Sequence, residues 1–470
     1  MGFFAKKQAP KVDERGVPIP LDYKSLSKSD TIFSFSLIAS LFFLWGLSYG
    51  LVDVLNKHFL NIFGLTRVQS TLLQFSYFVS YLLVAPPMGF FMRKYGYKIG
   101  IHIGLGLFSL GTILYWPAAV YEKFGMFVGF TFITASGLAT LEVAANSYIT
   151  ILGPPEHAAM RLVLAQAANG VSTVIGPLIA AQAFFKGENS ASLSTVQYVY
   201  LALCCVGIAL NIGIYFAKLP EITQILDGDA NEKTGSFWQQ HRLVWGVVAQ
   251  FFYVGAQVAV ASFTVFYITE IRGISPRIDD STASNMFSGC QAVFTVGRFA
   301  GVLYLRYFDP AFALFVSGTM LVLFSVLVST LPAYGGIACL YIVFFFESIC
   351  YPVIFTIATA DLGPWFKIGS GCIAAAVSGG AAFPAMQGAV ADYSSTSTSF
   401  FIPMTGFIVV MCYGFLMWRS RSRKYGQPWS VWVVSDSQLT NPEGRFSPAF
   451  DDEKGEDIKR EHAEIEVASK

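Results

Sequence analysis

Four charged side chains lie within long apolar runs of this sequence. They are Asp53, Glu142, Arg298 and Glu347. If those runs cross a membrane, a charge at the centre of a span costs roughly 2.5–3.5 kcal/mol on insertion scales. Such a residue is rarely kept without a function, so these four positions are the first candidates for chemistry.

Glu142 has the most informative surroundings of the four. It lies in Gly137-Leu-Ala-Thr-Leu-Glu-Val-Ala-Ala-Asn, and Asn146 follows four residues later, on the same face of a helix. Burial among small and apolar residues disfavours the charged carboxylate, so this group could load and release a proton near neutral pH. The alternative is a structural hydrogen bond to a neighbouring helix. Asp53 lies closer to the end of its run, where simple hydration is an equal alternative.

The other two charges allow more than one interpretation. Glu347 either pairs with a cation or lines a cavity. Arg298 lies between Gly297 and Gly301, near the expected cytoplasmic end of its run. For Arg298, extension of the side chain to the membrane interface, or an ion pair that gates the protein, explains the position better than solute binding.

Polar residues recur at helical spacing in two further runs. One face of the first carries Gln166, Asn169, Thr173 and Gly176, and one face of the second carries Gln250, Tyr253, Gln257 and Thr264. Amide side chains donate and accept hydrogen bonds, which suits a neutral polyhydroxylated solute. The alternative is that these side chains join helices to one another. The candidates for solute binding are Asn146, Gln166, Asn169, Tyr253 and Gln257.

Several classes of protein are disfavoured. The sequence has no HExxH or GxxxxGK[ST] motif, and its seven cysteines lack metal-ligand spacing. We therefore expect neither an enzyme nor a metal site nor a cofactor. Without a phosphate-binding loop, a proton gradient rather than ATP is the expected energy source. A net charge of +1 gives no reason to expect nucleic acid as a partner.

The composition predicts that these residues lie in a membrane protein. Hydrophobic residues make up 54% of the 470 residues and charged residues only 13%, about half the charged share of a soluble protein. A span needs about 20 mostly apolar residues. Twelve runs qualify, near 32–55, 69–92, 99–120, 125–148, 161–185, 196–218, 241–268, 283–306, 310–331, 334–360, 368–391 and 399–418. The fold class is therefore an all-α membrane protein with twelve transmembrane helices.

The distribution of basic residues predicts the orientation. Loops that share a face with the termini carry roughly three times as many Lys and Arg residues as the opposite loops, which places both termini in the cytoplasm. The expected parts are a cytoplasmic tail (1–31), a six-helix bundle (32–218), a cytoplasmic linker (219–240), a second six-helix bundle (241–418) and a charged cytoplasmic tail (419–470).

The two bundles look duplicated. Gly89-Phe-Phe-Met-Arg-Lys-Tyr ends the second span and Gly301-Val-Leu-Tyr-Leu-Arg-Tyr ends the eighth; Leu152-Gly-Pro ends the fourth and Leu362-Gly-Pro the tenth. The two matches lie at nearly the same offset, 212 and 210 residues. They indicate two parallel six-helix repeats, the layout of major facilitator carriers, whose central site lies between the halves.

Eight ordered segments then resemble one branch of that superfamily, the fucose:proton symporters. They include Phe43-Leu-Trp-Gly, Val68-Gln-Ser-Thr-Leu-Leu-Gln-Phe, Met92-Arg-Lys-Tyr-Gly-Tyr-Lys, Tyr115-Trp-Pro-Ala-Ala, Leu141-Glu-Val-Ala-Ala-Asn, Arg161-Leu-Val-Leu-Ala-Gln-Ala-Ala-Asn, Ala249-Gln-Phe-Phe-Tyr-Val-Gly-Ala-Gln and Tyr351-Pro-Val-Ile-Phe. The resemblance implies that Asp53 and Glu142 couple sugar movement to protons and that Gln166 recognises the sugar.

The sequence also departs from this branch. Ser48 and Tyr49 stand where bacterial relatives carry asparagines, and Glu347 stands in an expected apolar position. The leading hypothesis is a monomeric, proton-coupled importer of a fucose- or hexose-like monosaccharide in the cell membrane. The alternatives are an exporter of a small metabolite or toxin and, less favoured, a sugar sensor that does not transport.

Overall fold

The computed structural model describes residues 26–64, 72–184, 193–217, 219 and 236–425, and within these the side chains of 52–58, among others, are left undescribed. All described residues belong to one compact unit, Met1–Val433. The predicted tails, 1–31 and 419–470, and the predicted linker, 219–240, lie largely outside the described residues.

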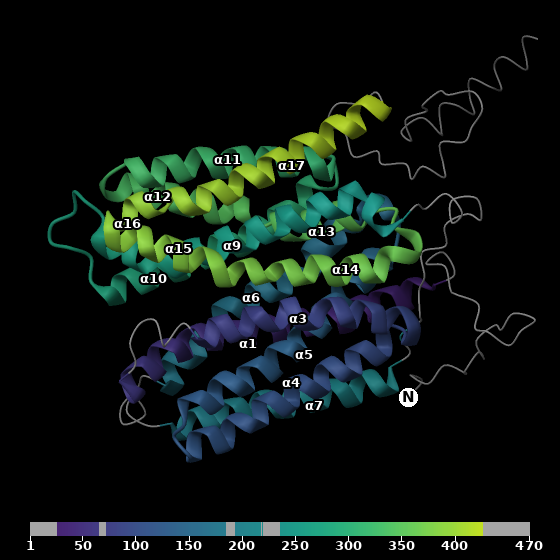
Figure 1. Cartoon of the computed structure of the whole chain (residues 1–470), viewed down its shortest axis with the longest axis horizontal. Coiled ribbons are helices and arrows are strands. Elements are labelled where there is room, and N and C mark those ends of the chain that lie inside the picture. The colour runs from purple at the N-terminus through teal and green to yellow at the C-terminus, as the bar shows by residue number, and fades with distance from the viewer. Residues whose placement is uncertain (1–25, 65–71, 185–192, 218, 220–235, 426–470) are drawn as a thin grey trace, which may run out of the picture. The chain divides into compact units, whose positions relative to one another are not determined.

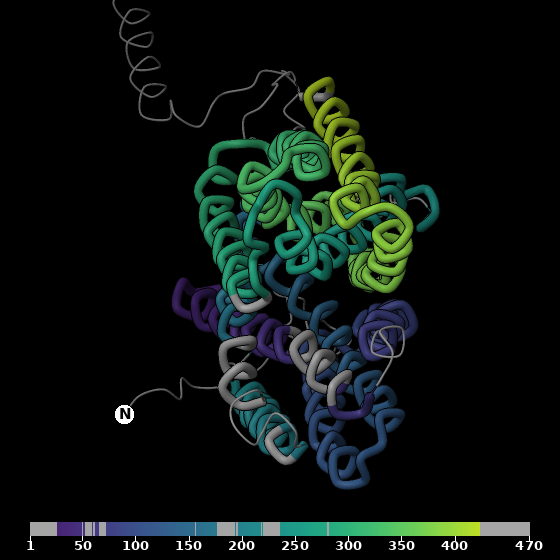
Figure 2. Tube along the Cα trace, turned by 90° about the vertical axis from the view of Figure 1, so that its left-hand side faces the viewer, coloured from purple at the N-terminus to yellow at the C-terminus, as the bar shows by residue number. Residues whose placement is uncertain are grey.

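The described part of the chain is helical, with twelve helical segments long and apolar enough to cross a membrane, which confirms the predicted fold class. Figure 1 shows the helices as long, roughly aligned rods, and Figure 2 shows many of them end on. The main helices are α1 (Lys28–Phe63), α3 (Leu72–Tyr95), α4 (Tyr97–Val120), α5 (Phe124–Ile151), α6 (Ala158–Phe184), α7 (Ser194–Phe216), α9 (His241–Glu270), α10 (Asp280–Tyr304), α11 (Pro310–Thr330), α12 (Ala333–Glu347), α13 (Cys350–Thr359), α14 (Phe366–Ala375), α15 (Gly379–Tyr393), α16 (Thr396–Ser399) and α17 (Phe401–Tyr425).

Helix pairing repeats between the two halves. In the first half α1 packs on α6, α4 packs on α5 and α7, and α3 packs on α5. In the second half α9 packs on α15, α11 packs on α12 and α17, and α10 packs on α12. These are the same pairings shifted by six spans, so the duplication predicted from the sequence is present in the fold.

The two halves meet closely at the end of the bundle where α3 ends and α14 begins. A Cβ atom on Gly371 would lie 2.7 Å from the Ala85 carbonyl oxygen, and one on Gly89 would lie 2.6 Å from the Lys367 carbonyl oxygen. Only glycine permits this approach of the two backbones. The Lys367 ammonium donates a hydrogen bond to the Met92 carbonyl oxygen at 3.2 Å. This end of the interface is therefore sealed.

The last helix is longer than the sequence predicted. α17 continues to Tyr425, past the expected end of the span at residue 418. The Arg421 guanidinium pairs with the Asp309 carboxylate at 3.3 Å, and Asp309 also accepts hydrogen bonds from the first amides of α11. This contact joins the end of α17 to the start of α11, and it explains why the basic segment stays helical.

Candidate solute and proton site

A cavity of about 550 Å³ lies between the two halves. Its walls come from α1, α3, α5 and α6 of the first half and from α9, α10, α12 and α13 of the second. Ser284, Asn285 and Ser288 line it near the start of α10 and are exposed, whereas Phe294 and Arg298 line it further along and are buried. The cavity therefore opens at the end where α10 begins, opposite the sealed contact of α3 with α14.

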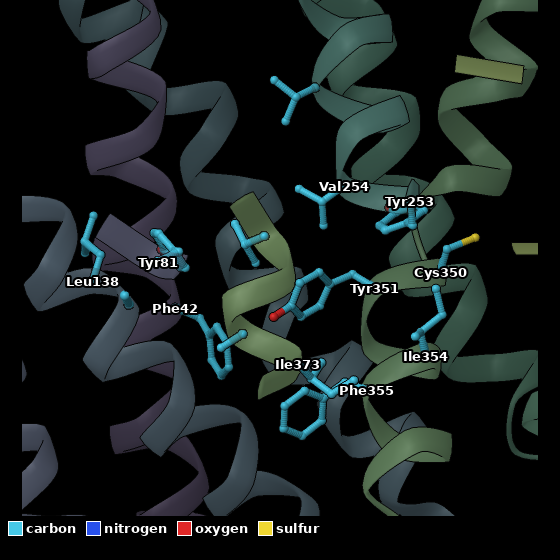
Figure 3. Close-up of a cluster of buried hydrophobic side chains, with 14 of the residues drawn as sticks. Phe42, Tyr81, Leu138, Tyr253, Val254, Cys350, Tyr351, Ile354, Phe355 and Ile373 are labelled. Atoms are coloured by element: carbon cyan, nitrogen blue, oxygen red, sulfur yellow. The ribbon is translucent and has the colours of Figure 1, made fainter. Parts of the chain in front are cut away.

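Glu142 lines this cavity and is 7% exposed. Its helix, α5, packs so closely on α4 that a Cβ atom on Gly137 would lie 2.4 Å from the Phe108 backbone nitrogen. The Tyr351 hydroxyl, from α13 of the other half, donates a hydrogen bond to Glu142 Oε1. Figure 3 shows the Tyr351 ring reaching from its own helix toward the side where Phe42 and Tyr81 lie. One carboxyl group thus joins the two halves across the cavity.

The second oxygen of Glu142 is differently placed. Oε2 is buried and has no hydrogen-bond partner of good geometry among the described residues, although the Tyr81 hydroxyl lies beside this carboxyl group. That hydroxyl accepts a hydrogen bond from Trp45 Nε1 at 2.7 Å. A carboxyl group with one satisfied oxygen and one unsatisfied oxygen is poised to bind a proton or a donor from a solute.

Asn146 and Gln166 extend the network around Glu142. Asn146 Nδ2 donates to the Tyr351 hydroxyl at 3.2 Å, and Gln166 Nε2 donates to Asn146 Oδ1 at 3.2 Å. Gln166 lines the cavity, whereas Asn146 is fully buried behind it. The structure therefore brings Glu142, Asn146 and Gln166 together. Asn146 bonds Gln166 directly and is linked to Glu142 through the Tyr351 hydroxyl.

Arg298 differs from its sequence interpretation. It is 5% exposed and lines the cavity instead of extending to the membrane interface. Its guanidinium donates to the Gln166 carbonyl oxygen and, at 2.9 Å, to Asn169 Oδ1, both on α6 of the first half. Among the described residues it forms no ion pair with a carboxylate. Arg298 instead binds neutral oxygens and connects α10 to α6.

The second half contributes Gln257 and Glu347 to the cavity. Gln257 is half-buried on α9. Glu347 is fully buried at the end of α12, and both of its carboxyl oxygens lack a hydrogen-bond partner among the described residues. Tyr253 is also fully buried but does not line the cavity; its hydroxyl donates to the Glu347 carbonyl oxygen at 2.7 Å.

A break in the tenth span explains these contacts. α12 ends at Glu347 and α13 begins at Cys350. Pro352 has no N–H, so the carbonyl of Ser348, four residues earlier, lacks its helical donor. Arg298 Nε donates to that carbonyl at 3.4 Å. Tyr253 and Arg298 thus satisfy backbone groups that the broken helix leaves open.

Other sequence candidates are placed as follows. Asp53 belongs to α1, but its side chain lies outside the described residues. Gln250 is fully buried and does not line the cavity. Tyr351 and Trp45, which do line it, were not singled out for chemistry; the only sequence signal was their place in the segments Tyr351-Pro-Val-Ile-Phe and Phe43-Leu-Trp-Gly. No cluster of His, Cys, Asp or Glu suited to a metal ion occurs in the described ranges.

The helix pairing and the central cavity define a twelve-helix membrane carrier. In agreement, residues 38–370 match the model of the Major Facilitator Superfamily, and the chain belongs to this family of transporters. A glucose/galactose transporter of Brucella abortus is 34% identical over 405 residues, covering 84% of this chain and 97% of the relative. The L-fucose-proton symporter of Escherichia coli is 31% identical over 422 residues, covering 83% and 94%. Within the superfamily, the chain belongs to the branch that contains these two transporters.

Solved structures agree with this assignment. The Escherichia coli fucose:proton symporter, crystallised in the outward conformation, matches with a TM-score of 0.72 and 30% identity over 83% of this chain and 99% of that one. A proton:xylose symporter matches with a TM-score of 0.63 at 15% identity, which reflects a shared fold alone. The protein is accordingly a multi-pass membrane transporter of the major facilitator type.

Proposed function

We propose that this protein imports a monosaccharide together with a proton by alternating access. The observation that carries the proposal is the buried carboxyl group of Glu142, which lines the cavity and is bound by a hydroxyl from the opposite half. Protonation of such a group changes the strength of a hydrogen bond between the halves. A proton and a solute that enter the same cavity can therefore both influence which side of the interface opens.

Neutral hydrogen-bonding groups on both halves support a sugar as the solute. Gln166, Asn169 and Gln257 line the cavity, with Trp45 and Phe42 beside them. Amides bind hydroxyl groups without adding charge, and aromatic rings pack on the apolar face of a sugar. Relatives named as glucose/galactose and L-fucose transporters support the same class. Asp53, in α1, is proposed as the second carboxylate of proton coupling.

We propose that the protein lies in the cell membrane, with both termini and the linker in the cytoplasm. The sealed end of the interface, where α3 meets α14, is the end at which α1 begins and α17 ends. With cytoplasmic termini the cavity opens to the outside, as expected for an importer ready to load. We propose a monomer, because each half supplies part of one complete cavity.

Uptake by a carrier-deficient host tests this function. Cells that make the protein should accumulate at least one labelled hexose or 6-deoxyhexose from a panel of D-glucose, D-galactose and L-fucose. Accumulation should be abolished by an uncoupler that collapses the proton gradient. Accumulation of none of these sugars, together with resistance to a secreted toxin, would instead support the export alternative.

A further inference from the structure

Glu347 is the least satisfied polar side chain of the cavity. It is 0% exposed, and neither Oε1 nor Oε2 has a hydrogen-bond partner among the described residues. It forms no ion pair within the described part of the chain. A buried carboxyl group that is left unpartnered costs several kcal/mol. Its retention therefore calls for a ligand that supplies the missing donors.

Three neighbouring side chains with donor groups make hydrogen bonds to other acceptors. The Tyr253 hydroxyl is committed to the Glu347 backbone carbonyl at 2.7 Å. The nearby Cys350 thiol donates to the Phe346 carbonyl at 3.4 Å. Arg298 donates from Nε to the Ser348 carbonyl oxygen and from Nη1 to oxygens of Gln166 and Asn169. These three side chains thus donate to other acceptors, and none of them bonds to the Glu347 carboxyl group.

The position of Glu347 suits a binding residue. It ends α12 at the break in the tenth span, and carriers of this kind build solute sites at broken helices near the midplane. It lies on the second half, whereas Glu142 and Gln166 lie on the first. The cavity therefore offers the solute acceptor groups on both of its walls.

We propose that Glu347 is a solute-binding residue that accepts hydrogen bonds from two neighbouring donors on the solute. A carboxyl group presents two oxygens side by side, which matches two adjacent donors. On a monosaccharide these are two adjacent hydroxyl groups, and this identification of the solute rests on the proposed function. Glu347 then selects sugars that carry both hydroxyls free.

Deoxygenated sugars combined with substitutions of Glu347 test the proposal. Equilibrium binding of D-glucose, D-galactose and L-fucose to the purified full-length protein identifies the sugar that binds most tightly. Binding is then measured for each monodeoxy analogue of that sugar. The proteins compared are the wild type, Glu347→Leu and Glu347→Gln. The control is Glu270→Gln, because Glu270 is a carboxyl group of α9 outside the cavity, bound to the Thr396 hydroxyl at 2.5 Å.

In the wild type, the two analogues that lack adjacent hydroxyls facing Glu347 should bind about tenfold or more weakly than the parent sugar. Glu347→Leu removes both contacts, so it should weaken binding of the parent by at least as much as either deoxygenation does. Within Glu347→Leu, the parent and those two analogues should bind with similar affinity, since neither hydroxyl has a contact left to lose. Glu347→Gln, which keeps one acceptor, should give an intermediate loss. Glu270→Gln should behave as the wild type.

Three outcomes would overturn the proposal. Unchanged binding of the parent sugar to Glu347→Leu would remove Glu347 from the site. If each analogue loses the same factor in affinity relative to the parent sugar in Glu347→Leu as in the wild type, then Glu347 contacts none of the deleted hydroxyls. Unchanged affinities with fewer protons moved per sugar would make Glu347 a second proton site instead. If the wild type binds no hexose, the proposed function fails together with the inference; in the other three outcomes the proposed function stands.

Discussion

Removal of the Tyr351 hydroxyl tests the hydrogen bond that joins the two halves. Tyr351→Phe keeps the ring and its packing but deletes one oxygen. That oxygen donates to Glu142 Oε1 and accepts from Asn146 Nδ2 at 3.2 Å. The substitution therefore breaks two buried hydrogen bonds and leaves Oε1 as unsatisfied as Oε2.

The cost of this substitution depends on the charge of Glu142. A hydrogen bond between neutral groups contributes about 0.5–1.5 kcal/mol, and one to a charged group contributes about 1.5–3 kcal/mol. If Glu142 exchanges a proton with the solvent, as proposed, its bond from Tyr351 is of the neutral kind at pH 5 and of the charged kind at pH 8. We expect Tyr351→Phe to lose about 1–1.5 kcal/mol more stability at pH 8 than at pH 5.

Thermal unfolding of the purified protein in detergent measures this difference, with each variant compared with the wild type at the same pH. Tyr267→Phe is the matched control. The Tyr267 hydroxyl is also buried in the second half, but it donates to a neutral acceptor, the Val328 carbonyl oxygen, at 2.7 Å. The control should lower the melting temperature equally at both pH values. An equal loss at both pH values for Tyr351→Phe would refute a titrating Glu142 at this contact.

Three further expectations follow from the fold and the cavity. Tags at both termini and in the loop 220–240 should be inaccessible to protease on intact cells, and cleavage of a C-terminal tag would contradict the twelve-span orientation. Gln166→Ala and Gln257→Ala should each raise the half-saturation concentration for the sugar several-fold at normal protein levels, since each deletes a neutral hydrogen bond worth about 0.5–1.5 kcal/mol. An unchanged half-saturation concentration in both variants would show that the two glutamines serve helix packing and do not bind the sugar. Gly371→Leu should block closure beside Ala85 and abolish transport while the protein still inserts, and normal transport would show that this contact opens freely.

The fold could be predicted from the sequence because the patterns that indicate it are long and occur more than once. Each span is a run of about 20 apolar residues, and the repeat of Gly89-Phe-Phe-Met-Arg-Lys-Tyr as Gly301-Val-Leu-Tyr-Leu-Arg-Tyr marks the duplication. Helix ends were less accessible. α17 reaches Tyr425 because Arg421 pairs with Asp309, a contact between residues more than a hundred positions apart.

The site was accessible only in part. Glu142 and Gln166 stand out because charge and amide groups are rare in apolar runs, and the structure places them in one network. Tyr351 did not stand out, because a tyrosine in an apolar run is ordinary until its partner is known. Arg298 was expected to extend to the membrane interface or to form a gating ion pair, because its position near a helix end carries no information about the acceptors on α6. Contacts between the two halves decide both roles, and no local pattern records them.

Glu142 is proposed to carry the proton that drives uptake. Glu142→Gln mimics the permanently protonated form at nearly constant volume. In proteoliposomes this variant should still exchange labelled sugar for unlabelled sugar, because exchange requires no proton release. It should fail to accumulate sugar in response to a pH gradient, because the empty carrier returns only after deprotonation. Exchange without accumulation is the expected result, and full accumulation by Glu142→Gln would contradict the account.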